Sequence, residues 1–251
     1  MFWFIPLVAF FAALLTFFSG FGLGTLLLAA LIWYYPPEIA IGITAIVHLL
    51  SSIVKSSFNR DINWSIAFYF GISSIFFAVL GSILLTELSN YPTYVYDLTE
   101  TTFTRPVSLL SFLIGIIMLV FSFIEVLLKG KSLRLPLWVG GAMSGFMGGL
   151  SGHQGALRSV FLMKEVKEVN QFVSTGALIG LATDLVRNAV YLNTIQWEEI
   201  DLTLLLLTAM AAILGVLVGT MALSKVNIRA IQVLVSFGMA LLGTAMMLGF
   251  I

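Results

Sequence analysis

Residues 144–158 read SGFMGGLSGHQGALR, a stretch that combines five glycines with a histidine, a glutamine and an arginine. Apolar runs of membrane length lie on both sides of it. Inside a bilayer, backbone polar groups must find partners within the protein or line a wet cavity. A glycine-rich, cationic break at this depth costs free energy. It therefore predicts a place where the chain does something other than cross the membrane.

The composition is that of a polytopic membrane protein. Of the 251 residues, 60% are hydrophobic and 10% are charged, whereas about 25% of residues in soluble domains are charged. Twelve basic residues balance twelve acidic ones, and the basic residues form no stretch with interleaved aromatics, which argues against nucleic acid as a partner. Cysteine is absent, which excludes a disulfide framework and a thiolate metal site. We expect no cofactor and no metal.

Two of the apolar segments are broken near the middle. The segments run roughly over 3–35, 38–57, 63–88, 107–128, 134–166, 168–192, 200–223 and 227–251. The first segment is interrupted by SGFGLG at 19–24, and the fifth by GGLSGHQG at 148–155. The N-terminus lacks a basic region and a small-residue cleavage site, so we expect it to be the first membrane element rather than a signal peptide.

The chain shows a weak internal repeat. A shift of 132 residues places Ser19-Gly20 on Ser151-Gly152, Ser51-Ser52 on Thr183-Asp184, and Lys55 on Arg187. One residue further on, the turn INW at 62–64 meets IQW at 195–197. Because the order of elements also repeats, we predict two transmembrane repeats, 1–128 and 134–251. The alternative is chance similarity between apolar stretches that share Gly, Ser and Leu.

Loop charges bear on the orientation of the two halves, because short cytoplasmic loops carry an excess of Lys and Arg. The loops at 129–134, 164–168 and 224–229 hold three, two and two Lys or Arg residues, whereas 87–105 and 197–201 are acidic. These three loops with Lys and Arg are all cytoplasmic if each broken segment enters and leaves the membrane on the same side. The sequence thus predicts an all-α protein of two inverted repeats, each a re-entrant helix hairpin plus three transmembrane helices. Eight full spans in two parallel halves are the alternative.

The two breaks are the predicted substrate site. Helix N-termini present unpaired N–H groups and partial positive charge, which together suit an anion. Arg158, early in the second half-helix, opposes the helix dipole and therefore favours an anion nearby. We expect backbone N–H groups to cradle that anion, Arg158 to pair with it, and His153 and Gln154 to orient it. Close helix packing through glycine is the alternative. The predicted substrate-binding residues are Ser19, Gly20, Gly22, Gly24, Ser151, Gly152, His153, Gln154, Gly155 and Arg158.

A second group of polar residues is predicted to serve coupling or the transport pathway. It comprises His48, Ser51, Ser52, Lys55, Thr183, Asp184, Arg187 and Asn188. Asp184 and Arg187 are three residues apart on a helix and can pair, either as a charge relay or as a self-neutralised pair near the interface. Lys55 lies close to the end of its span, so we expect its side chain to extend to the lipid headgroups. His48 lies in mid-span, where it either carries protons or bonds a neighbouring helix.

The stretch GLSGHQGALRS, together with SGFGLGTLLLAAL and TGALIGLATDLVRNAVY, resembles the sulfite exporter family TauE/SafE over nearly the full chain. The family's usual triple glycine followed by a proline is missing from both halves. The resemblance implies a secondary transporter of small anions, such as sulfite, organosulfonates or related organic anions, that works by alternating access in the cell (plasma or inner) membrane. Protons or a counter-ion, and a homo-oligomer, are open possibilities.

Two other function classes are open. A passive anion channel would share this sequence and differ in its kinetics. An intramembrane enzyme would need a nucleophile or a pair of acids. The sequence has no G-x-S-x-G motif, and Asp184 is the only acid of the second half that lies away from the ends of its spans, so we expect no enzyme.

Overall fold

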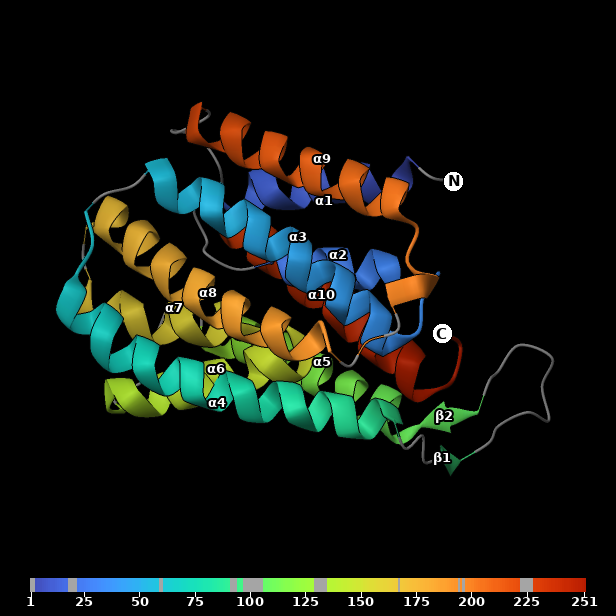
Figure 1. Ribbon diagram of the computed structural model, residues 1–251. Helices are drawn as coiled ribbons and strands as arrows, with labels where there is room; N and C mark the ends of the chain where they lie inside the picture. Colours follow the sequence, from blue (N-terminus) through green and yellow to red (C-terminus); the bar gives the residue numbers. More distant parts are fainter. Residues whose placement is uncertain are drawn as a thin grey trace.

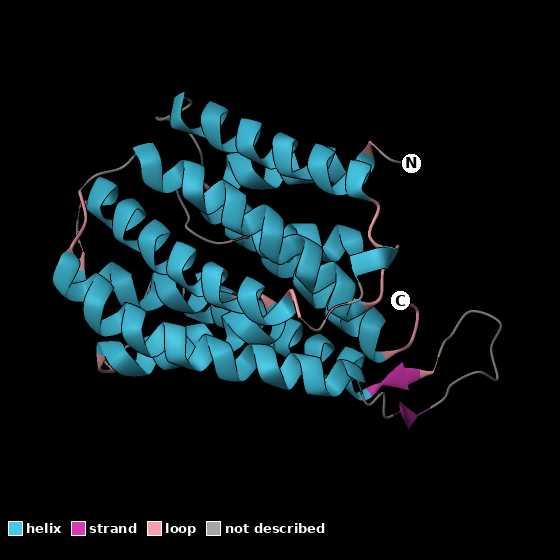
Figure 2. Cartoon of the chain, viewed as in Figure 1, coloured by secondary structure: helices cyan, strands magenta, loops and turns pink. Residues whose placement is uncertain are grey.

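The computed structural model is a bundle of helices (Figures 1 and 2). It describes residues 3–17, 22–58, 61–90, 94–96, 106–128, 135–166, 168–193, 195, 197–221 and 228–251. The predicted site residues Ser19 and Gly20 lie outside this set.

The described chain forms ten α-helices, a 3-10 turn and one small β-hairpin. The first elements are α1 (Phe4–Thr16), α2 (Leu23–Leu31), α3 (Pro37–Phe58), α4 (Trp64–Asn90), β1 (Tyr94–Tyr96) and β2 (Val107–Ser108). They are followed by α5 (Leu109–Leu128), α6 (Leu137–Ser151), α7 (Gln154–Glu165), α8 (Val169–Tyr191), η1 (Trp197–Glu199), α9 (Leu202–Met221) and α10 (Ile228–Met247). The two strands pair antiparallel.

Helix length separates the elements into two kinds. Helices α3, α4, α5, α8, α9 and α10 have 20 to 27 residues, enough to cross a hydrocarbon layer of about 30 Å at 1.5 Å per residue. Within the described part, α3, α4 and α9 also meet the hydropathy expected of membrane spans. By contrast, α1, α2, α6 and α7 have 9 to 15 residues and are too short to cross alone.

Large apolar side chains cover the outside of the bundle. Phe68, Leu206 and Phe237 are 62%, 54% and 68% exposed. Such a surface is unfavourable in water but suits the acyl chains of a bilayer, whereas Ser, Thr, His, Asp and Arg side chains are buried inside. The chain is therefore a helical membrane protein whose buried core includes polar side chains.

Both short helix pairs turn at a glycine. Gly22, which precedes α2, has φ of 111°, and Gly152, which follows α6, has φ of 81°. Backbone in this left-handed region is strained for residues that carry a Cβ. The predicted breaks at 19–24 and 148–155 are therefore confirmed as helix interruptions over their described residues.

Four pairs of helices pack closely against each other. Helix α6 lies along α4, α1 along α9, α5 along α10, and α3 against α8. The α6–α4 contact depends on glycine, because a Cβ at Gly145 would lie 2.0 Å from the Ser74 carbonyl oxygen. Gly215 of α9 plays the same part against α1, where a Cβ would lie 2.3 Å from the Phe10 carbonyl oxygen. Small residues thus let these backbones approach within the membrane.

Candidate functional site

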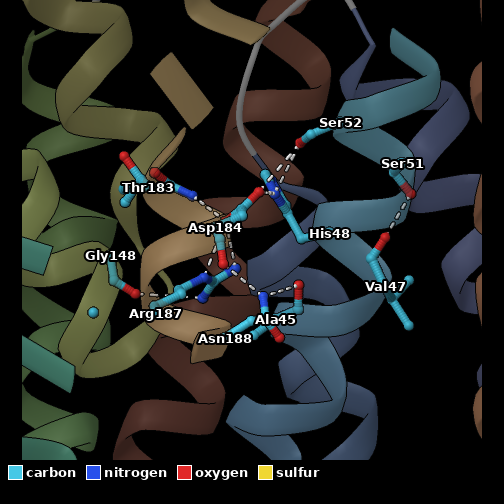
Figure 3. A network of polar contacts seen from close by, with 12 residues as sticks. Ala45, Val47, His48, Ser51, Ser52, Gly148, Thr183, Asp184, Arg187 and Asn188 are labelled. Carbon is cyan, nitrogen blue, oxygen red and sulfur yellow. Dashed lines mark hydrogen bonds and ion pairs between the residues drawn. The ribbon is translucent and has the colours of Figure 1, made fainter. Parts of the chain in front are cut away.

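The crossing of α3 and α8 brings a histidine onto a carboxylate at the centre of the bundle (Figure 3). His48 Nδ1 lies 2.6 Å from Asp184 Oδ2, and Ser52 Oγ donates to the same oxygen at 3.2 Å. Asp184 is fully buried. Of the two roles open for His48, bonding to a neighbouring helix is present, and a proton role stays a prediction.

The second carboxylate oxygen of Asp184 is held from two directions. Arg187 Nε and Nη2 lie 3.0 and 2.9 Å from Oδ1, and Gln154 Nε2 donates to it at 2.7 Å. Arg187 Nη1 also donates to the Gly148 carbonyl at 3.3 Å. The expected pairing of Asp184 with Arg187 is present, and both side chains are fully buried. The pair therefore lies inside the bundle rather than at its surface.

Asn188 and Thr183, which flank the ion pair, join α8 to other helices. Asn188 Nδ2 donates to the Ala45 carbonyl of α3 at 3.1 Å and to the Asp184 carbonyl at 2.8 Å. Thr183 Oγ1 lies 2.9 Å from Ser74 Oγ of α4. Both contacts give buried polar groups the partners that burial requires.

A cavity of about 40 Å³ lies between α3, α7 and α8, with room for a few water molecules or one small ion. We call it the basic cavity. Its polar lining residues are His48, Ser51, Ser52, Lys55, Arg158 and Ser159. Two of these side chains are cations, and among the described residues that line the cavity none is acidic.

Arg158 reaches the basic cavity across α8. A Cβ at Gly176 would lie 3.6 Å from Arg158 Nε, and a Cβ at Gly180 only 2.6 Å from Nη1. The guanidinium therefore lies in a groove that these two glycines leave on α8. The sequence placed Arg158 beside His153 at the break. The structure separates them, because five residues of helix turn the direction of a side chain by about 140°.

Lys55 also differs from its sequence interpretation. Its side chain lines the basic cavity, and Nζ lies 4.8 Å from the centroid of the Phe17 ring. The ammonium is thus held by a cation–π contact inside the protein rather than extended to the headgroups.

A second, smaller cavity of about 10 Å³ lies where the two helix breaks meet. We call it the break cavity. It is lined by Gly22, Gly24, Thr25, His48, Phe121, Gly152, His153, Gly155, Ala156 and Met239. The two breaks approach closely, since a Cβ at Gly24 would lie 3.4 Å from the Gly152 carbonyl oxygen. His48 lines both cavities and so lies between them.

The histidine of the second break is fixed in orientation. His153 is 3% exposed, its Nδ1 lies 3.0 Å from Ser151 Oγ, and its ring stacks on Phe121. Gln154 does not face the break cavity. Its side chain holds Asp184, and its backbone carbonyl accepts from Ser144 Oγ at 2.9 Å.

Two contacts were missed from the sequence. His48 and Asp184 are 136 residues apart, and Lys55 meets Arg158 only through the cavity that they share. One signal was available: Ser52 and Asp184, which the 132-residue shift superposes, touch each other. Among the described residues, no group of three or more His, Asp or Glu could hold a metal ion.

A family model described as Sulfite exporter TauE/SafE matches residues 5–246, nearly the whole chain. The matched range includes both helix breaks and both cavities. The comparison with curated proteins and the comparison with solved structures each found no match.

Proposed function

The chain belongs to the sulfite exporter TauE/SafE family, and on this basis we propose that it is a secondary transporter of small anions with its substrate site in the basic cavity. The substrate class is sulfite, organosulfonates or related organic anions. Arg158 and Lys55 would supply the positive charge, and the hydroxyls of Ser51, Ser52 and Ser159 would supply further hydrogen bonds.

The observation that carries this proposal is the charge of the cavity lining. Ionisable groups within a membrane protein are costly, and they face functional pathways or each other. Here two cations share one cavity with no acidic side chain among its described lining residues. An anion between them would neutralise both charges and form charge-assisted hydrogen bonds, which are the stronger kind.

The same proposal includes two inverted repeats, 1–128 and 134–251, that alternate access to the site. Three features support it. In Figure 1 the α1–α2 hairpin opens toward the edge where the N-terminus lies, and the α6–α7 hairpin opens toward the opposite edge. The packing of α1 on α9 matches that of α6 on α4. Ser52 contacts Asp184, the residue that the 132-residue repeat makes its counterpart. Equivalent residues of two halves meet in this way when they lie on a two-fold axis between the halves.

These elements suggest a pathway through the protein. The substrate would pass between the basic cavity and the break cavity, with His48 and Asp184 between the two. Such sites, at the meeting point of broken helices from two inverted halves, are typical of secondary transporters. The protein would be a multi-pass protein of the plasma (inner) membrane, with the loops at 129–134, 164–168 and 224–229 in the cytoplasm.

A binding assay on the purified protein tests the proposal. Thermal unfolding would be recorded with sulfite, sulfate, thiosulfate, sulfoacetate, lactate and oxalate. An anion at 100 times its Kd should stabilise the folded state by about 2.7 kcal/mol. We expect one of these anions to stabilise the native chain more than it stabilises Arg158→Gln or Lys55→Met. Gly238→Ala is a suitable control, because its new Cβ would lie within 4 Å of no atom of the described residues. Equal stabilisation of all four proteins would place the site elsewhere.

A further inference from the structure

We propose that the break cavity is a second anion site, which binds its anion together with one proton held at Nε2 of His153. This inference rests on the proposed anion transport, and it adds a site and a coupled ion to it. It is carried by two helix N-termini that face one cavity and by a buried histidine nitrogen that has no hydrogen-bond partner among the described residues.

The donors of the site come from the backbone. Helices α2 and α7 begin at Leu23 and Gln154, and the residue before each, Gly22 or His153, makes no side-chain cap hydrogen bond. The first N–H groups of a helix lack partners within it, and each helix start carries about half a positive charge. Residues from the first turns of both helices line the break cavity. The cavity is therefore rich in donors and electropositive.

The hydrogen bonds of Ser151 determine which nitrogen of His153 holds the ring proton. Ser151 Oγ donates its single proton to the Met147 carbonyl at 3.1 Å. It can therefore only accept at Nδ1 of His153, 3.0 Å away, so Nδ1 carries the hydrogen. A neutral imidazole with hydrogen on Nδ1 has a bare lone pair at Nε2.

That lone pair is buried without a donor. Nε2 has no hydrogen-bond partner among the described atoms, and the ring is 3% exposed. The ring cannot easily turn away, because it stacks on Phe121 with centroids 5.8 Å apart and planes 22° apart. A buried acceptor without a donor is unfavourable, and a ligand that supplies a proton here would satisfy it.

A bare anion alone does not suit this arrangement, because its oxygens would face the Nε2 lone pair. One proton resolves the conflict in either of two ways. The anion can carry an acidic hydroxyl that donates to Nε2, or the imidazolium can donate to a fully ionised anion. Both states contain one anion and one proton, so binding and protonation are linked.

The charged groups around His153 also favour binding of the anion and the proton together. His48 of α3 lines the same cavity, and Arg187 of α8 approaches Gly152, where a Cβ would lie 3.2 Å from Nη1. The residues of α2, α5 and α10 that line the cavity are uncharged. The only carboxylate of this network within the described chain, Asp184, is already shared by His48 and Arg187. A proton on His153 therefore requires an anion beside it.

The present volume of about 10 Å³ suits one water molecule, so an anion must widen the cavity. Met239 of α10 forms part of the wall, and methionine is the lining side chain that adapts most readily. Widening by displacement of Met239 leaves the two helix starts and the His153 ring in place.

The test uses the fact that the chain has only two histidines. Protein labelled with 15N in its histidine rings is studied by NMR with and without saturating sulfite or methanesulfonate, and His153→Gln assigns the signals. Without anion, we expect hydrogen on Nδ1 and an unprotonated Nε2 in His153. With anion, the Nε2 signal should move to the protonated or proton-sharing position. Calorimetry in buffers of different ionisation enthalpy should show uptake of about one proton per methanesulfonate bound at this site.

The pH dependence gives a second readout. Methanesulfonate carries no proton of its own, so its Kd at this site should rise about tenfold per pH unit where free His153 is neutral. His153→Gln keeps an amide near the same place and should abolish both the proton uptake and this pH slope.

Failures of the two proposals are distinguishable. If sulfite stabilises the native protein but leaves Nε2 unchanged and takes up no proton, the second site is wrong and the basic cavity stands. If Nε2 carries hydrogen before any anion is added, the second site is equally wrong. If Arg158→Gln weakens sulfite binding while the His153 signal still responds to methanesulfonate, the two cavities are separate sites, as proposed. If no anion binds the native protein, both proposals fall.

Discussion

Substituting Gly180 by alanine should move the guanidinium of Arg158 while leaving the fold intact. The new Cβ would lie 2.6 Å from Arg158 Nη1, whereas ordinary contacts begin at 3.4 Å. To restore an ordinary contact, the separation must grow from 2.6 to 3.4 Å, so the guanidinium should shift by about 0.8 Å. Because the group is the far end of a flexible side chain, we expect it to yield at little cost in folding free energy.

The same shift matters for a bound anion. A displacement of this size turns a hydrogen bond of about 2.9 Å into a separation of about 3.7 Å, which is no longer a hydrogen bond. A hydrogen bond to a charged group contributes about 1.5 to 3 kcal/mol. At 1.4 kcal/mol per factor of ten, Gly180→Ala should weaken anion binding about 10- to 150-fold.

Gly238→Ala on α10 is the control, because it makes the same substitution away from the basic cavity, and its Cβ would lie within 4 Å of no atom of the described residues. Titration of both variants with sulfite by calorimetry, with thermal unfolding measured beside it, separates binding from stability. The reasoning is refuted if the two variants bind sulfite equally, or if Gly180→Ala loses binding only because it unfolds.

Three further predictions concern the stability of the purified protein. Asp184→Asn leaves Arg187 buried without its carboxylate and should cost about 3 to 5 kcal/mol; adding Arg187→Met should restore part of it, and no recovery in the double variant would argue against the pair. Gly145→Ala forces a Cβ to 2.0 Å from the Ser74 carbonyl oxygen and should separate α6 from α4, destabilising the fold by about 3 kcal/mol or more; a native-like melting temperature would contradict this. Gly152→Ala places alanine at φ of 81° and should cost about 1 to 2 kcal/mol, measured by thermal unfolding, and no loss would indicate that the turn relaxes.

The sequence predicted the features that depend on local chemistry. Glycines at 22 and 152 mark the two helix interruptions because only glycine tolerates their backbone angles without strain. The three-residue spacing of Asp184 and Arg187 predicts their contact because it places them on one helix face. The resemblance to the TauE/SafE family is likewise confirmed by the match over residues 5–246.

What the sequence could not predict depends on how helices cross. Arg158 and His153 are neighbours in the motif, yet they line different cavities because α7 turns between them. The inward position of Lys55 follows from the placement of the Phe17 ring, which no local pattern encodes. The bond between His48 and Asp184 requires α3 to lie against α8 at one particular height. Such contacts are set by tertiary packing rather than by residue spacing.

The most direct test of the account is sulfite flux into vesicles that contain the purified protein. Labelled sulfite uptake would be followed in the native chain, Arg158→Gln and the control Gly238→Ala, with membrane current recorded in parallel. We predict saturable uptake that is accelerated by sulfite on the opposite side, at least tenfold slower in Arg158→Gln and unchanged in Gly238→Ala. If Arg158→Gln takes up sulfite as fast as the native chain, the substrate does not bind in the basic cavity. If uptake rises linearly with sulfite concentration and carries an ohmic current, the protein is not a transporter.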